Sequence, residues 1–223
     1  MKYFFLGCIF FVIESQVVTA QVSNQLWSEL GVSGKLSEKV SYGADFSFRQ
    51  SIYRTETFFP QVTIKYGLLE CLKPSVSYLF IQNHSGNGFN ASHRINFNVD
   101  YKQKLNRFKV GLRLRYQLNF SGFNGGYDPE FDKTIRFRAS SSFDIPRSKI
   151  NPLFWGELFY DPTNWYYGRQ VSKFRFFLGF NYRPTKQWSL SCGYLRDERI
   201  NQPNPQFRNV LQLGLTYSLN KED

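Results

Sequence analysis

The sequence lacks long apolar runs, helical patterning and, for the most part, cysteine. Beyond its N-terminus it has no stretch of about 18 or more apolar residues, the length that a membrane-spanning helix needs. Hydrophobic residues nowhere recur at the spacing of an amphipathic helix. Three cysteines are present, and Cys71 and Cys192 lie so far apart that we expect no disulfide framework. These absences exclude a helical membrane protein and argue against a disulfide-stapled secreted domain.

Aromatic residues, in contrast, are abundant in a chain that is mildly polar. They make up 19% of the residues, and the mean hydropathy is −0.41. A transmembrane β-barrel combines these two properties, because half of each strand faces a polar lumen while aromatic girdles mark the membrane interfaces. The composition therefore favours strands that face lipid.

The stretch FKVGLRLRYQLNF, residues 108–120, alternates strictly between apolar and polar side chains. Successive side chains of a β-strand point to opposite faces, so this strand has one apolar face and one charged face. The pattern recurs along the chain and predicts an all-β fold, a transmembrane antiparallel up-and-down β-barrel of about 10–12 strands. The expected strands are 25–36, 39–50, 57–68, 73–82, 94–102, 108–120, 134–144, 150–160, 173–183, 187–196 and 206–219.

Short and long connections alternate between these strands, which predicts a meander with two unlike ends. Aromatic residues of the lipid-facing parity fall in two groups: Tyr66, Tyr101, Tyr182, Trp188 and Tyr217 beside short turns, and Phe48, Phe58, Phe80, Phe120, Phe174 and Phe207 beside long loops. Single-chain bacterial barrels normally have an even number of strands. We therefore expect that one strand is missed or over-assigned, and we place it in the N-terminal stretch QVSNQLWSELGVSGKL.

Residues 1–20 have the features of a secretory signal peptide, with Lys2, an apolar stretch and a small-residue site ending at Ala20. Residues 21–223 would then form one barrel domain in the bacterial outer membrane. Removal of the signal leaves the formal charge of +11 unchanged. The cationic residues are dispersed along alternating strands, so nucleic acid is not an expected partner. Outer-membrane lipid and the phosphates of lipopolysaccharide are expected partners instead.

The chain resembles an uncharacterised family of outer-membrane β-barrels of Gram-negative bacteria, a domain family of unknown function. The resemblance rests on the Trp-bearing strand QLWSELGVSGKL, on YGADFSFRQ, on the central SHRINFNVDYKQKL and on the closing VLQLGLTYSL. It covers nearly all of the chain after residue 20. The resemblance implies the fold and a location in the outer membrane, and it supplies no activity, cofactor or catalytic residue.

Charged residues of the inward parity form the main candidate site. In the structural interpretation they are an ion-paired plug that fills a small barrel. In the functional interpretation they line a narrow pore that favours anions. We favour the plug, and the excess of arginine still suggests affinity for a small anionic ligand. The candidates are Arg49, Arg94, Arg113, Arg115, Arg136, Arg138 and Arg175 with Glu29, Asp45, Asp100 and Glu157, joined by Lys65, Lys102 and Lys109.

Two further patterns carry weaker signals. The stretch QNHSGNGFNASHR superficially resembles the histidine and serine motif of outer-membrane phospholipases and lipid A deacylases, but Ser85 directly follows His84 and would point to the opposite face of a strand. We expect a Gly/Asn-rich outer loop there and no catalysis. Asp128, Glu130 and Asp132 could attract Ca²⁺ but lack the spacing of a calcium loop, so no metal site is expected.

Overall fold

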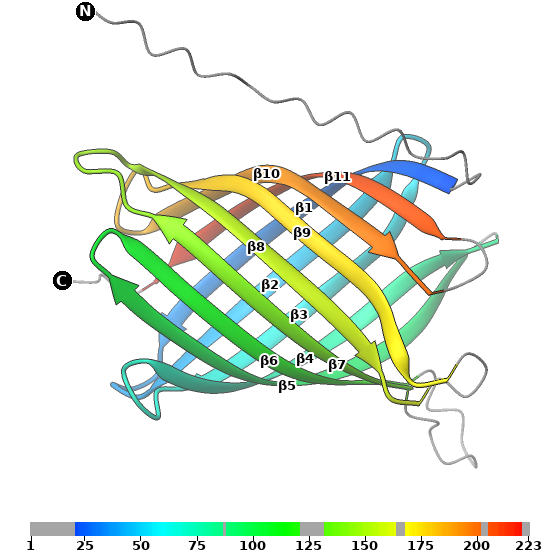
Figure 1. Ribbon diagram of the computed structural model, residues 1–223, viewed down its shortest axis with the longest axis horizontal. Helices are drawn as coiled ribbons and strands as arrows, with labels where there is room; N and C mark the ends of the chain where they lie inside the picture. The colour runs from blue at the N-terminus through cyan, green and yellow to red at the C-terminus, as the bar shows by residue number, and fades with distance from the viewer. Residues whose placement is uncertain (1–20, 87, 121–131, 164–167, 202–204, 220–223) are drawn as a thin grey trace, which may run out of the picture.

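The computed structural model describes residues 21–86, 88–120, 132–163, 168–201 and 205–219, which form a closed barrel of eleven strands (Figure 1). No helix in the described part of the chain is long and apolar enough to cross a membrane. The strands are β1 (Gln21–Lys35), β2 (Val40–Ser51), β3 (Thr55–Tyr66), β4 (Leu72–Ser85), β5 (Gly88–Leu105), β6 (Phe108–Phe120), β7 (Asp132–Phe143), β8 (Ile150–Asp161), β9 (Gln170–Tyr182), β10 (Trp188–Arg199) and β11 (Gln206–Ser218).

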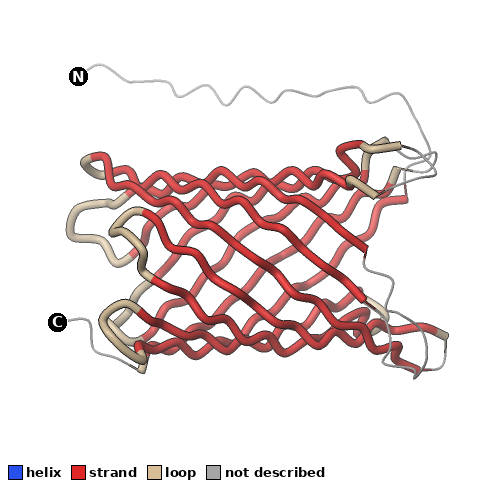
Figure 2. The backbone as a smooth tube through the Cα atoms, turned by 90° about the horizontal axis from the view of Figure 1, so that it is seen from below, coloured by secondary structure: helices blue, strands red, loops and turns tan. Residues whose placement is uncertain are grey.

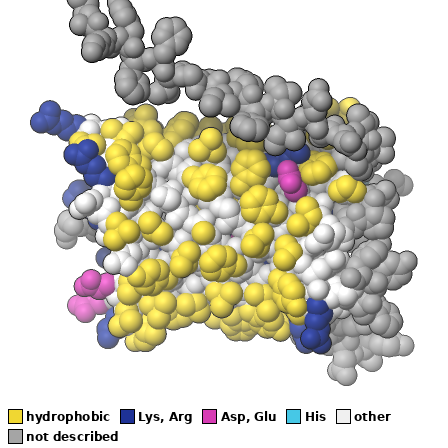
Figure 3. Space-filling model, in the orientation of Figure 1, with side chains coloured by type: hydrophobic (Ala, Val, Ile, Leu, Met, Phe, Trp, Pro, Cys, Tyr) yellow, Lys and Arg dark blue, Asp and Glu magenta, His cyan; other side chains and the backbone are white. Residues whose placement is uncertain are grey.

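Alternation along the strands places apolar side chains outside and charged side chains inside, which confirms the predicted fold class. In β6, Leu112 and Leu114 are 40% and 53% exposed, whereas Arg113 and Arg115 line internal cavities. Figure 3 shows hydrophobic side chains over the middle of the visible outer face and charged ones toward the two ends. Such an outer face requires an apolar surrounding medium.

Strand pairing is sequential and antiparallel from β1 through β11, and the barrel is closed by β1 beside β11. This closing pair is parallel, with a register from Gln21↔Gln206 to Ser33↔Ser218. An odd number of alternating strands makes the first and last run the same way, so only a parallel pair can close the sheet. The eleven strands lie within the expected 10–12, and among the described residues no strand is missing or surplus, so the expectation that one strand had been missed or over-assigned was wrong.

The strand connections gather at the two ends of the barrel (Figure 2). One end has the turns β1–β2, β3–β4, β5–β6, β7–β8 and β9–β10, and we call it the short-turn end; the other is the long-loop end. The described N-terminus at Gln21 lies at the long-loop end, and β11 finishes at the short-turn end. The expected signal peptide, residues 1–20, lies outside the described residues.

The stretch expected as a Gly/Asn-rich outer loop is a continuation of two strands. β4 and β5 remain paired from Phe80↔His93 to Ser85↔Gly88, so the chain reverses tightly around Gly86, whose φ is 56°. Glycine adopts this left-handed conformation without steric cost, and the flanking residues are therefore free to stay in the ladder.

The two expected aromatic groups lie at opposite strand ends. Trp188 begins β10 and Tyr217 lies near the end of β11, with ring centroids 4.8 Å apart at the short-turn end. The ring centroids of Phe48 and Phe58 lie 6.5 Å apart, beside the turn between β2 and β3 at the long-loop end. This sorting fits two membrane interfaces, where amphipathic and aromatic rings collect.

Candidate functional site

In the part of the chain that the structure describes, a polar cavity lies toward each end of the lumen. The long-loop cavity has a volume of about 720 Å³ and the short-turn cavity about 480 Å³. Of the predicted inward residues, the long-loop cavity is lined by Glu29, Arg49, Arg94, Arg113, Arg115, Arg136, Arg138 and Arg175. The short-turn cavity is lined by Asp45, Lys65, Asp100, Lys102, Arg113 and Arg115.

Glu157 is the predicted residue that lies behind the cavity wall, where it neutralises arginines of neighbouring strands. Its side chain is 1% exposed, and its carboxylate accepts hydrogen bonds from Arg136 at 2.6 Å and Arg138 at 3.2 Å. Arg175 approaches the same carboxylate to 4.0 Å. A buried carboxylate is tolerated only when it is paired in this way.

A second buried acid, Asp197, was missed by the sequence analysis because the expected strand ended at residue 196. Its side chain is 2% exposed and lies 3.3 Å from Arg175, 3.7 Å from Lys173 and 3.8 Å from Arg208. Arg175 thus bridges Glu157 and Asp197. Two carboxylates face five cationic side chains in this network, so it retains excess positive charge.

Inward aromatic rings hold several of the arginines. The Arg138 guanidinium lies 4.1 Å from the Trp155 ring, that of Arg136 4.2 Å from Phe159, and that of Arg49 4.2 Å from Trp27. Cation–π contacts of this kind fix the plane of a guanidinium. The alternation rule missed Trp155 and Phe159, because LFWGELFYD is apolar on both faces of β8. Glu157 has an aromatic residue two positions away on each side, Trp155 and Phe159, and this pattern could have identified the inward face of β8.

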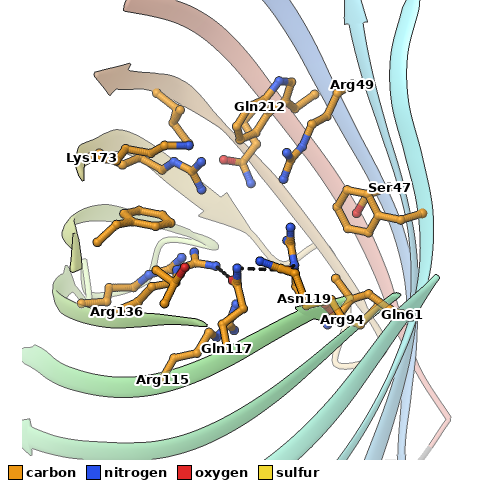
Figure 4. A pocket seen from close by; sticks show the side chains of 18 of the residues that line it. Ser47, Arg49, Gln61, Arg94, Arg115, Gln117, Asn119, Arg136, Lys173 and Gln212 are labelled. Carbon is orange, nitrogen blue, oxygen red and sulfur yellow. Dashed lines mark hydrogen bonds between the residues drawn. The ribbon is translucent and has the colours of Figure 1, made fainter. Parts of the chain in front are cut away.

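Four arginines that line the long-loop cavity lack a carboxylate within ion-pair distance among the described residues: Arg49, Arg94, Arg115 and Arg199. Arg94 donates to the side-chain oxygen of Asn119 at 2.5 Å, and Arg115 donates to that of Asn98 at 2.5 Å. Arg49 has its aromatic contacts. Their charge is therefore available to a solute in the cavity, and Figure 4 shows Arg49 and Arg94 directed into the same space from different walls.

The two cavities meet at three side chains that line both: Gln61, Arg113 and Arg115. Arg113 is held by Asp100 at 2.6 Å, and Gln61 donates to Asp45 at 3.4 Å. These contacts arise from strands β2, β3, β5 and β6 on one side of the lumen. We call the group Gln61, Arg113 and Arg115 the constriction.

The opposite side of the lumen is filled by inward apolar residues. Trp27, Trp155, Phe177, Leu195 and Val210 form one buried cluster, contributed by β1 and β8–β11. The short-turn cavity correspondingly has almost no lining from β8–β11. The free space of the short-turn cavity is therefore confined to the side formed by β1–β6, whereas the long-loop cavity also reaches Trp27, Trp155 and Leu195 of the cluster.

The residues of the weaker motifs do not form a site in the described structure. His84 packs edge-on against Phe89 with ring centroids 5.4 Å apart, and His93 is hydrogen-bonded to the Tyr78 hydroxyl at 2.6 Å. In the described part of the chain no hydrogen bond joins a histidine to Ser85. Asp132 begins β7, Asp128 and Glu130 lie outside the described residues, and no metal-binding group of three was found among those described.

A closed barrel with an apolar outer face and a charged lumen defines this protein as a transmembrane β-barrel. The chain belongs to the family described as protein of unknown function (DUF2490), whose model matches residues 24–209. This confirms the family resemblance of the sequence. The structure is also similar to the NanC porin, with a TM-score of 0.50 and 14% identity over 77% of this chain and 84% of the other. At this identity the similarity concerns the fold. No curated protein matches.

Proposed function

We propose that the protein is a narrow outer-membrane channel that favours small anions. The apolar outer face, the two aromatic groups and the barrel fold support a membrane location. The fold shared with a porin supports a channel. The surplus of arginine in the lumen supports a preference for anions, because fixed positive charge in a narrow bore attracts anions and repels cations.

The observation that carries the proposal is the constriction. Of the residues that the structure describes, Gln61, Arg113 and Arg115 alone line both cavities, so a solute moving between them passes two guanidinium groups. Arg115 has an amide partner and not a carboxylate, and its charge remains exposed to the passing solute. A small anion would exchange part of its hydration for these donors.

Conductance across planar bilayers tests the proposal. The refolded protein should produce discrete current steps, and in a KCl gradient the reversal potential should have the sign of chloride selectivity. A cation-selective current would contradict the proposal, and so would the absence of current from protein shown to be folded by its heat-dependent gel mobility. In the latter case the barrel is an ion-paired plug, the alternative supported by the Glu157 network and the inward apolar cluster.

The outer-membrane address and the signal peptide are part of the same proposal. Membrane fractionation should recover the protein with outer membranes, and N-terminal sequencing should find Gln21 first. Recovery in the soluble periplasmic fraction would contradict both. We further propose that no lipid hydrolysis depends on His84, so His84→Ala should leave any phospholipase or deacylase activity unchanged.

A further inference from the structure

Three guanidinium groups from strands far apart in sequence gather in the long-loop cavity. Arg49 belongs to β2, Arg94 to β5 and Arg175 to β9, and all three line the cavity. Arg49 and Arg175 both contact the Trp27 ring, at 4.2 Å and 5.1 Å from its centroid. Arg94 and Arg175 are close enough to Arg49 to repel it, and Arg175 also repels Arg94.

Arg49 is the least satisfied member of this group. Its guanidinium lies between the rings of Trp27, at 4.2 Å, and Phe59, at 5.0 Å, and makes no ion pair or hydrogen bond with the described residues. Contacts with aromatic faces leave the N–H groups at the edge of the guanidinium plane free to donate. These donors open on the cavity, where Figure 4 shows Arg49 and Arg94 pointing inward.

The number and directions of these donors indicate the class of ligand. A carboxylate is planar and can be satisfied by one arginine through two parallel hydrogen bonds. Three guanidinium groups that approach from different walls match a tetrahedral dianion with three or more acceptor oxygens. A bound dianion would also relieve the mutual repulsion of Arg49, Arg94 and Arg175.

The cavity is larger than a single tetrahedral ion. Its volume of about 720 Å³ lies in the range of small-molecule sites. Neutral polar side chains also line the cavity, among them Ser47, Gln61, Gln117 and Asn119, as do the acids Glu29, Asp132 and Asp161. These groups can hydrogen-bond a polar organic carrier of the anionic group.

We propose that Arg49, Arg94 and Arg175 form a binding site for a phosphoryl dianion, free or as a small phosphate ester. The site rests on the proposed anion-binding role of the lumen and names the class of anion. Arg49 and Arg94 supply the donors without a carboxylate, while Arg175 is held in place by Glu157 and Asp197.

Calorimetric titration of the folded full chain in detergent micelles tests the site without requiring ion flow. The probes are inorganic phosphate, glycerol phosphate and acetate, all at one ionic strength. Both phosphates should bind at least about tenfold more tightly than acetate, because a phosphoryl dianion accepts more charge-assisted hydrogen bonds than a carboxylate does. Tighter binding of glycerol phosphate identifies the ester as ligand, and equal or tighter binding of inorganic phosphate identifies the free ion.

Substitutions assign the binding to the three arginines. Arg49→Gln should weaken phosphate affinity by about tenfold or more, with a smaller loss for Arg49→Lys, which keeps the charge and removes the planar donor edge. Lys73→Gln removes the same charge from the lining of the short-turn cavity and should leave the affinity unchanged. If Arg49→Gln fails to fold, Arg49→Lys and Arg94→Gln provide the comparison.

Two results would overturn the site: equal affinity for acetate and phosphate, or unchanged phosphate affinity in folded Arg49 and Arg94 variants. Either result leaves anion conductance to be judged by the bilayer experiment. A wild type that binds phosphate in micelles and passes no current would overturn the channel and support the site.

Discussion

Glu157 is 1% exposed and lies within 4.0 Å of three arginines, which makes it the central counter-ion of the lumen. Its position on β8 places it between β7, which carries Arg136 and Arg138, and β9, which carries Arg175. Without this carboxylate, Arg136 and Arg138 would lose their ion-pair partner, and Arg175 would keep only Asp197 among the described residues. The arginine content of the barrel therefore depends on very few buried acids.

Glu157→Gln should lower the free energy of unfolding by about 3–5 kcal/mol, because removing one partner of a buried ion pair leaves the other charges uncompensated. Urea unfolding in lipid vesicles, followed by tryptophan fluorescence, measures the loss. The matched control is Glu198→Gln. Glu198 pairs with Arg196 at 2.8 Å with both side chains 27% exposed, so its loss should cost less than about 1 kcal/mol. Equal effects of the two substitutions would contradict the role of Glu157.

At the scale of elements, β6 shows the alternation most simply, and its outward face allows a test of the surrounding medium. Leu114 lies midway along β6 and is 53% exposed. Leu114→Arg should cost about 2–4 kcal/mol in vesicles, because the charge would lie near the bilayer midplane. Phe108→Arg, at the first residue of the same strand and on the same face, should cost only about 0–1 kcal/mol. Equal costs at both positions would argue against a lipid-facing strand.

Strands β9 and β10 approach each other where two glycines face across the pair. Gly179 lies opposite Gly193, and a Cβ added at Gly193 would lie 2.5 Å from the Leu178 carbonyl oxygen and 2.7 Å from the Gly179 Cα. Gly193→Ala should therefore destabilise the barrel by about 1–3 kcal/mol through overpacking. Gly43→Ala is the control, since the nearest atom to its added Cβ is 3.8 Å away. Urea unfolding measures the free energy of unfolding of both variants. Equal values for Gly193→Ala and Gly43→Ala would contradict the close approach of β9 and β10.

The sequence was sufficient to predict the strands whose two faces differ in polarity, such as β6 and β9. It was insufficient where both faces are apolar, because Trp155 and Phe159 point inward while Phe154 and Leu158 point outward on the same strand. The sequence also led to a wrong prediction, an outer loop, for the Gly/Asn-rich stretch between β4 and β5. Turn-forming residues there lie in a paired ladder, which is stabilised by neighbouring strands that local propensity does not include.

At the scale of the whole molecule, the alternation along each strand was enough to predict which charged side chains face the lumen. It could not predict which of them form ion pairs with one another. Asp197 on β10 neutralises Lys173 and Arg175 of β9 and Arg208 of β11, and such contacts depend on the registers of neighbouring strands. The parallel closure of β1 on β11 likewise joins residues at opposite ends of the sequence. Only the closed barrel brings these groups together.

The constriction lies where the two cavities of the lumen meet. Arg115 is the best residue for testing it. Arg113→Ala would leave Asp100, which is 4% exposed, without its ion-pair partner, whereas Arg115 is held only by Asn98. Arg115→Ala therefore removes volume and one positive charge from the constriction and leaves no buried carboxylate without its ion-pair partner.

Arg115→Ala should increase single-channel conductance and shift the reversal potential in a KCl gradient toward zero, because the bore widens and its fixed charge falls. Lys109→Ala provides the matched control: it removes one charge from the same inward face of β6, beyond the residues that line either cavity. Its effect on selectivity should be small, since water and salt screen charges near the rim. If the two substitutions shift the reversal potential equally, the selectivity arises from the overall charge of the lumen and not from the constriction.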